Sequence, residues 1–235
     1  MKVLVIDDDP DVLEVVSLTF EMRWPDSTIV SAPNGDTGIE MVDAENPALV
    51  ILDIGLPDMD GFTVCQEIRR FSDVPIVMLT VRNKEADIVK GLQLGADDFV
   101  AKPFRPIEFM ARVQSVLRRT QSIAYAGGDE KPFRHHSLLV DFNKHEVYLG
   151  EKRLKLTPTE YQLLYHLTKN AGKVMTHRTL LGRVWGREYL DETNYLKVHI
   201  KHLRQKLDDD PAEPKYIMTE RTVGYKFAKV EQKAA

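Results

Sequence analysis

The stretch "VILDIGLPDMDG", residues 50–61, decides the fold of the first half of the chain. Its apolar residues Val50, Ile51 and Leu52 predict a strand that is buried on both faces and that runs straight into the carboxylate of Asp53. Burial of an uncompensated charge is costly, so a carboxylate at the end of such a strand requires a cause. The following turn is rich in proline, aspartate and glycine, which indicates that the chain reverses as Asp53 reaches the edge of the sheet.

Around this stretch, apolar runs of strand length alternate with segments of helical periodicity. The five strand–helix pairs are residues 3–6 and 11–20, 28–32 and 35–43, 49–52 and 63–70, 75–79 and 85–94, and 98–101 and 106–119. Because right-handed crossovers place helices on both faces of a parallel sheet, these pairs predict a five-stranded, doubly wound α/β fold. Binding sites in such folds form beyond the carboxyl ends of the strands.

Polar side chains stand at or just after the ends of four of these strands. They are Asp7 and Asp8 after the first, Asp53 at the end of the third, Thr80 at the end of the fourth, and Lys102 after the fifth. Three adjacent carboxylates would raise one another's pKa, so their grouping makes sense if a cation compensates them, and an all-oxygen site favours Mg²⁺. With the ion and Lys102 neutralising phosphoryl oxygens, Asp53 is the best-placed acceptor of a phosphoryl group.

Length and composition indicate two domains of ordinary size, each with its own core, because the chain has 235 residues and is 43% apolar. The longest apolar runs are far shorter than the roughly 20 residues of a membrane span, and no secretory signal is recognisable. We therefore expect a cytoplasmic protein without a membrane partner. The single cysteine, Cys65, excludes an internal disulfide and is expected to be a structural thiol.

The net charge of −4 hides an asymmetry between the two halves. Residues 1–120 carry 12 basic and 21 acidic side chains, whereas residues 121–235 carry 20 basic and 15 acidic ones. An acidic half suits a metal or a cationic partner, and a basic half suits phosphates. Two solvated surfaces of different charge are the alternative interpretation.

Residues 121–133, "QSIAYAGGDEKPF", lack periodicity and predict a linker between a domain of residues 1–120 and a domain of residues 134–235. After the linker, short alternating runs with a turn at Gly150 predict a small antiparallel sheet. Three helical segments follow at residues 158–171, 176–185 and 191–207, and the first opens with the capping-box pair Thr157 and Glu160. Two final strands are expected at residues 216–219 and 225–228.

The third of these helices has one apolar stripe and one polar side. Leu196, Ile200, Leu203 and Leu207 fall on the stripe, which must face a core. The opposite side carries Asn194, Val198, Lys201 and Gln205, flanked by Lys197, His202 and Arg204. Such a face suits the major groove of DNA, where amides and cations reach base edges and phosphates and a valine can touch a thymine methyl. An ordinary solvated helix face is the alternative, and a zinc site at His199 and His202 is disfavoured because no further ligand has matching spacing.

The segments "VLVIDDDP", "VILDIGLPDMDG", "VMLT" and "GADDFVAKPF" resemble the receiver domain of two-component response regulators, over residues 1 to about 120. The resemblance implies a flavodoxin-like fold. It also implies that Asp53 is the phosphoacceptor and that Thr80 and Lys102 contact the phosphoryl group. The implied ligands of Mg²⁺ are Asp7, Asp8, Asp53 and the carbonyl of Gly55. The peptide bond before Pro103 would be cis. Two departures are Phe99, at the switch position where tyrosine is usual, and Val81, which is bulkier than the usual residue.

The segments "LTPTEYQLLYHLTKNAGKVMTHRTLLGRVWG", "VHIKHLRQKL" and "TERTVGYKF" resemble the winged-helix DNA-binding domain of OmpR/PhoB-type regulators, from about residue 134 to 229. The resemblance implies an α+β domain with a recognition helix at residues 193–207 and a wing at residues 221–224 that enters the minor groove. The expected DNA contacts are Trp185, Asn194, Lys197, Val198, Lys201, His202, Arg204, Thr219, Arg221 and Tyr225. Departures at Asn194, Lys197 and Thr222 indicate that the DNA sequence read differs from that of better-known relatives.

We therefore expect a phosphorylation-controlled transcription regulator and not an enzyme, with a sensor histidine kinase as phosphoryl donor. Expected partners are double-stranded promoter DNA with repeated half-sites and a second copy of the chain, and RNA polymerase is a further candidate. By resemblance the dimer interface contains Asp97, Asp98, Glu108, Arg112 and Arg119, although Ile88 replaces the usual basic partner of Glu108. The alternatives are a regulator of the same fold that binds DNA without phosphorylation, and a phosphohydrolase that uses Asp53 as nucleophile. The second is disfavoured because no substrate cap or second acid/base carboxylate is recognisable.

Overall fold

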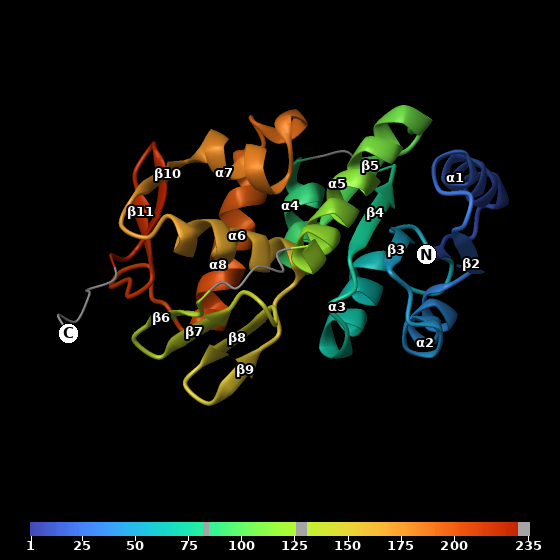
Figure 1. Ribbon diagram of the computed structural model, residues 1–235. Helices are drawn as coiled ribbons and strands as arrows, with labels where there is room; N and C mark the ends of the chain where they lie inside the picture. The colour runs from blue at the N-terminus through green and yellow to red at the C-terminus, as the bar shows by residue number, and fades with distance from the viewer. Residues whose placement is uncertain (82–84, 126–130, 230–235) are drawn as a thin grey trace. The chain divides into compact units, whose positions relative to one another are not determined.

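The computed structural model describes residues 1–81, 85–125 and 131–229 (Figure 1). The chain divides into two compact units, Met1–Leu117 and Arg118–Ala235. Among the described residues, no helix has the length and apolarity needed to cross a membrane.

The first unit is a five-stranded parallel sheet with helices between its strands, as the sequence predicts. The strands have the order β2-β1-β3-β4-β5 and all pair in parallel. The elements are β1 (Lys2–Ile6), α1 (Pro10–Arg23), β2 (Thr28–Ala32), α2 (Gly35–Glu45), β3 (Leu49–Asp53), α3 (Gly61–Phe71), β4 (Ile76–Thr80), α4 (Glu85–Gln93), β5 (Asp98–Ala101) and α5 (Pro106–Tyr125). The predicted flavodoxin-like class is therefore confirmed.

Alternate residues of the central strands point to opposite faces of the sheet, and each face has its own apolar core. Val3 and Val5 pack on the face covered by α1 and α5, together with Phe20 and Phe109. Leu4 and Ile6 point to the other face and pack with residues of α2 and α3. Burial on both faces explains why these strands are uninterrupted apolar runs.

Helix α5 differs from the prediction at its end. It continues to Tyr125, beyond the expected end at residue 119, and so includes the first five residues of the expected linker. Of that linker, residues 126–130 lie outside the described residues.

After α5, the described residues of the second unit form two antiparallel sheets and three α-helices. The first sheet has the order β6-β7-β8-β9 and the second the order β10-β12-β11. The elements after α5 are β6 (Phe133–His135), β7 (Leu138–Asp141), β8 (Glu146–Leu149), β9 (Lys152–Leu154), α6 (Pro158–Lys169), β10 (Val174–Thr176), α7 (His177–Val184), the 3₁₀ helix η1 (Arg187–Tyr189), α8 (Thr193–Leu207), β11 (Ile217–Glu220) and β12 (Gly224–Phe227). The predicted winged-helix architecture is confirmed, and the short strand β10 adds to the expected hairpin by pairing with β12.

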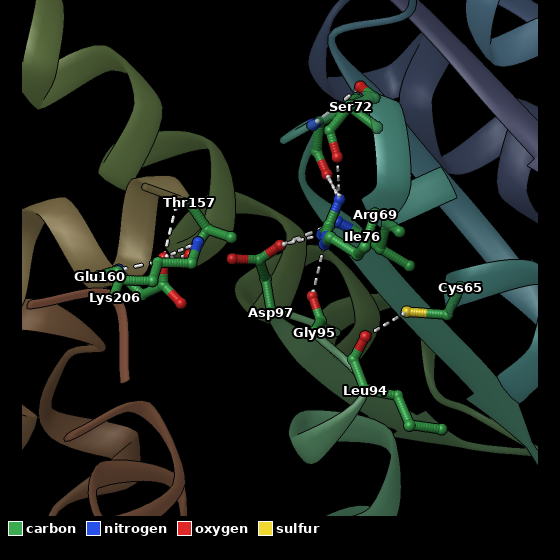
Figure 2. Close-up of polar contacts among 11 residues, drawn as sticks. Cys65, Arg69, Ser72, Ile76, Leu94, Gly95, Asp97, Thr157, Glu160 and Lys206 are labelled. Carbon is green, nitrogen blue, oxygen red and sulfur yellow. Dashed lines mark hydrogen bonds and ion pairs between the residues drawn. The ribbon is translucent and has the colours of Figure 1, made fainter. Parts of the chain in front are cut away.

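Helix α6 begins with the capping box that the sequence predicts. The Thr157 hydroxyl accepts a hydrogen bond from the backbone N–H of Glu160, and the Glu160 carboxylate accepts one from the backbone N–H of Thr157 (Figure 2). Lys206 of α8 lies 2.7 Å from the same carboxylate. The start of α6 and the end of α8 are therefore joined by one polar cluster, in which Thr157 and Glu160 are buried and Lys206 is partly exposed.

Candidate functional site

The carboxyl ends of β1 and β3 bring three carboxylates together. Ligand oxygens of Asp7, Asp8 and Asp53 all lie within 4.8 Å of one another, so the cluster could hold a metal ion. Asp7 and Asp53 are each 6% exposed, whereas Asp8 is exposed. Burial, and to a smaller extent the charge of Asp53, raises the pKa of Asp7 even though Lys102 acts in the opposite direction.

Lys102 is the cation that faces this cluster. Its Nζ lies 2.7 Å from a carboxylate oxygen of Asp7 and 2.7 Å from a carboxylate oxygen of Asp53. Burial disfavours the ammonium charge, but the hydrogen bonds to Asp53 and Asp7 outweigh it and raise the pKa of Lys102. The peptide bond between Lys102 and Pro103 is cis, as the resemblance implies.

The loop between β3 and α3 folds tightly around Asp53. The backbone N–H of Gly55 donates to the Asp53 carboxylate at 2.6 Å, and Gly55 also forms a bridge with Asp60, which caps α3. Gly61 must lack a side chain, because a Cβ atom there would meet the backbone carbonyl of Asp53. The loop therefore holds Gly55 beside the carboxylate of Asp53.

Asp58 attaches the same loop to the start of α2. Its two carboxylate oxygens accept hydrogen bonds from the backbone N–H groups of Gly35 at 2.9 Å and Asp36 at 3.0 Å. These bonds lower the pKa of Asp58. Nothing in the local sequence around Asp58 predicts this role, because its partner residues are more than 20 positions away along the chain.

Thr80 and Phe99 lie on the neighbouring strands β4 and β5. Thr80 is 1% exposed and ends β4, whereas Val81 directly after it is 77% exposed. Phe99 is 4% exposed, and a Cβ atom added to Gly91 of α4 would come within 2.8 Å of its ring. The absence of a side chain at Gly91 thus leaves room for the aromatic ring inside the core.

Three of the five residues expected at the dimer interface are buried within the chain. Asp97, Asp98 and Arg119 are each at most 1% exposed. Asp97 accepts hydrogen bonds from Arg69 at 3.1 Å and from the backbone N–H of Ile76 at 3.0 Å (Figure 2). These three side chains are therefore buried in the unmodified chain, and their place at a dimer interface stays a prediction.

The remaining two interface candidates keep accessible surface. The side chain of Glu108 is 54% exposed and that of Arg112 is 29% exposed, and Arg112 also pairs with Asp98 at 3.3 Å.

In the second unit, the exposed face of α8 is formed by Lys197, Lys201 and Gln205, at intervals of four residues. Asn194 and His202 are partly exposed beside it. Lys197 was expected on the flank of the helix, but its exposure places it on the same stripe as Lys201, one turn earlier.

Two predicted DNA contacts on this part of the chain are contradicted by burial. Val198 is 6% exposed and Trp185 is fully buried. Val198 was assigned to the outer face on the assumption that α8 has one buried side, but α8 packs against both α6 and α7, so a wider part of its circumference is covered. The indole of Trp185 packs against Tyr195 and His199 of α8 instead.

The wing is the hairpin of β11 and β12. Arg221, Thr222 and Val223 at its tip are exposed, as is Thr219 on β11. Tyr225 is only 6% exposed, so little of its surface can reach DNA. Arg204, expected to contact DNA phosphates, has a side chain that is 11% exposed and hydrogen-bonded to β11.

Comparison with known proteins identifies both units. Residues 3–114 match the family described as "Response regulator receiver domain", and residues 150–227 match "Transcriptional regulatory protein, C terminal". The protein described as "Regulatory protein VanR", from Enterococcus faecium, is 40% identical over 230 residues, which cover 97% of this chain and 99% of that protein. The chain belongs to the response regulators of the OmpR/PhoB type. A response regulator of this type joins phosphorylation-dependent control to transcription regulation.

Solved structures agree with this assignment. The response regulator DrrB, a Thermotoga maritima OmpR/PhoB homologue, is 31% identical, with a TM-score of 0.50 over 97% of this chain and 98% of that chain. A mutant of the protein RitR is 27% identical, with a TM-score of 0.75 over 97% of this chain and 99% of that chain. The order of a receiver followed by a DNA-binding domain is therefore common to this response regulator and its relatives.

Proposed function

We propose that Asp53 accepts a phosphoryl group from a partner histidine kinase and that this modification controls DNA binding by the second unit. The observation that supports the proposal is the grouping of Asp7, Asp8 and Asp53 within 4.8 Å, with Lys102 at 2.7 Å from two of them. No other arrangement of ionisable side chains described above combines a strand-end carboxylate with a compensating cation in this way.

The donor set of the cluster fits Mg²⁺. Carboxylates of Asp7, Asp8 and Asp53 and the backbone carbonyl of Gly55 would hold the ion, since hard cations prefer oxygen ligands. When bound, the ion supplies positive charge that offsets the negative charge of a phosphoryl group.

In the reaction, an oxygen of the Asp53 carboxylate bonds to phosphorus while the bond between phosphorus and the kinase histidine breaks, and the electron pair of that bond returns to the imidazole. Lys102 would turn from the carboxylates to a phosphoryl oxygen, a charge-assisted contact. The hydroxyl of Thr80 would donate to another phosphoryl oxygen. The Thr80 side chain is buried in the unmodified chain, so this contact requires a movement that brings its hydroxyl to the phosphoryl group.

For DNA binding, we assign base and phosphate contacts to the exposed residues of α8 and to the tip of the wing. Lys197, Lys201 and Gln205 would lie in the major groove and Arg221 in the adjacent minor groove, where its guanidinium fits a narrow A·T-rich tract. Repeated half-sites would be bound by two copies of the chain, and RNA polymerase is a further candidate partner.

The dimer that we propose relies on few charged pairs. Glu108 and Arg112 are the expected interface residues that keep accessible surface, and Ile88 cannot supply the basic partner of Glu108. Because exposed ion pairs contribute about 0–1 kcal/mol each, dimerisation should be weak. We expect phosphorylation to shift the equilibrium from monomer toward dimer. Analytical ultracentrifugation of the phosphorylated protein would contradict this if only monomer were seen at every accessible concentration.

Substitution of Asp53 tests the phosphoryl-transfer proposal. Asp53→Asn keeps the size of the side chain and removes its nucleophilic charge, so labelling with radioactive acetyl phosphate in the presence of Mg²⁺ should be lost. Asp11→Asn, which changes a carboxylate of the first turn of α1, is the matched control and should label normally. Stoichiometric labelling of Asp53→Asn would refute the assignment.

A second candidate function is a regulator that binds DNA without phosphorylation. The burial of Phe99 favours this alternative, because its ring is already inside the core of the unmodified chain. Unlike a tyrosine, Phe99 has no hydroxyl group that water could keep at the surface. The affinity for DNA with and without acetyl phosphate decides between the two: an equal affinity would support the alternative, and an increase on phosphorylation would support the first proposal.

A further inference from the structure

Arg204 joins the recognition helix α8 to the first strand of the wing. Its Nη2 donates to the backbone carbonyl of Ile217 at 2.6 Å and to the hydroxyl of Thr219 at 3.0 Å. The guanidinium lies 5.9 Å from the centre of the Tyr225 ring on the other strand of the wing. One α8 side chain thus contacts both strands of the hairpin.

Asp209, two residues after the end of α8, forms hydrogen bonds at the start of β11. Its carboxylate accepts hydrogen bonds from the backbone N–H groups of Lys215 at 2.6 Å, Tyr216 at 3.0 Å and Ile217 at 2.9 Å. The Asp209 side chain is fully buried, and its Oδ2 lies 4.0 Å from Nε of Arg204. The backbone N–H of Asp209 also donates to the carbonyl of Arg204 at 3.0 Å.

The two residues form part of a groove between the exposed face of α8 and the wing. The groove has a volume of about 570 Å³, and its lining includes Lys197, Lys201 and Tyr225 as well as Arg204 and Asp209. A carboxylate close to a DNA-binding surface would repel phosphates if it were exposed and unpaired. Here three backbone N–H groups donate to the Asp209 carboxylate, and the Arg204 guanidinium lies 4.0 Å from it, so the carboxylate is compensated within the unit.

We propose that Arg204 and Asp209 are positioning residues that fix the distance between the exposed face of α8 and the wing, and hence the spacing of the major-groove and minor-groove contacts on DNA. The inference rests on the proposed assignment of DNA contacts to these two elements. Arg204 then determines specificity through the geometry of the protein and not through a contact with a phosphate.

The spacing of the binding site tests the proposal. The probe is a duplex selected from random sequence by the full-length, acetyl phosphate-treated protein, together with a version in which one base pair is inserted between the major-groove element and the minor-groove element. The insertion lengthens the site by about 3.4 Å along the helix axis. We expect the unaltered protein to lose about tenfold in affinity for the longer duplex, and Arg204→Lys and Asp209→Asn to lose about threefold or less.

The salt dependence of binding separates this role from direct contact with phosphate. If Arg204 bound a phosphate, Arg204→Lys would retain the charge and the spacing discrimination, while Arg204→Gln would lower the salt slope by about one ion. If the proposal is correct, Arg204→Gln and Asp209→Asn both relax the spacing discrimination and leave the slope unchanged. Full discrimination in Asp209→Asn would overturn the proposal.

Folding and DNA contact are controlled separately. Thermal unfolding shows whether Arg204→Gln has lost its structure. If it has, Asp209→Asn becomes the deciding variant, because its side chain keeps an acceptor oxygen for the backbone N–H groups. Lys201→Ala tests the underlying assignment: if its affinity for both duplexes equals that of the unaltered protein, the proposed DNA face is wrong, whatever the result for Arg204.

Discussion

Replacement of Lys102 by methionine should strengthen the binding of Mg²⁺ to the carboxylate cluster. The Lys102 ammonium lies 2.7 Å from one oxygen each of Asp7 and Asp53, two of the carboxylates that would hold the ion. For an ion bound to one of these oxygens at about 2.1 Å, ion and ammonium would be at most about 4.8 Å apart, and their repulsion at an effective dielectric constant of 20 would be about 7 kcal/mol. Water and movement of the lysine reduce this value, but one fifth of it already corresponds to about a tenfold gain in affinity.

Two measurements examine this prediction. Isothermal titration calorimetry should give a dissociation constant for Mg²⁺ that is about tenfold lower in Lys102→Met than in the unaltered protein. Thermal unfolding should show a lower Tm for the variant in EDTA, because the carboxylates lose their cation, and a larger increase when Mg²⁺ is added. Lys2→Met is the matched control, since Lys2 pairs with Glu45 at 2.8 Å on β1, away from the cluster. Equal or weaker Mg²⁺ binding by Lys102→Met would show that the lysine organises the site instead of competing with the ion.

Three further predictions concern buried or strained positions. Burial raises the pKa of the Cys65 thiol to about 12, so a thiol reagent at pH 8 should label the protein only after unfolding in urea, and labelling of the native protein would contradict this. Thr222 has a φ of +64°, a backbone conformation that costs a residue with a side chain about 1–2 kcal/mol. Thr222→Gly should therefore raise the free energy of unfolding of the second unit by about 0.5–1 kcal/mol in urea titrations, and a lower free energy of unfolding would be inconsistent with strain. Gly91→Ala should lower the stability of the first unit by about 1–3 kcal/mol, because the added methyl group collides with Phe99 and Met78; unchanged stability would mean that the core adapts freely.

Most of the receiver fold and its carboxylate cluster could be predicted from the sequence, because both depend on local patterns. Apolar runs such as that before Asp53 reveal strands directly, and parallel pairing then brings strand ends to one edge of the sheet. The grouping of Asp7, Asp8 and Asp53 could therefore be predicted from their positions at strand ends. The capping box at Thr157 was likewise a local signal, since both of its residues lie within one helical turn.

Side-chain partners that are distant in sequence could not be predicted in the same way. Arg69 and Asp97 are separated by 28 residues. No sequence periodicity shows that Asp97 forms its hydrogen bond to Arg69 inside the chain instead of lying on the surface. Arg204 was assigned to the phosphates because a cation on a helix flank is usually solvated, whereas its hydrogen bonds depend on where β11 lies. Val198 was assigned to the outer face of α8 for a related reason: how many neighbours cover a helix depends on the tertiary packing and not on the helix itself.

The bonds from Asp58 to the start of α2 also have a consequence for amide hydrogen exchange. The first N–H groups of a helix usually lack an acceptor and exchange quickly with water. In this chain those of Gly35 and Asp36 are bonded to Asp58, and that of Thr37 is bonded to Asn34. Opening of the loop that carries Asp58 must therefore release the first turn of α2, so the two segments should gain or lose protection together as one cooperative unit.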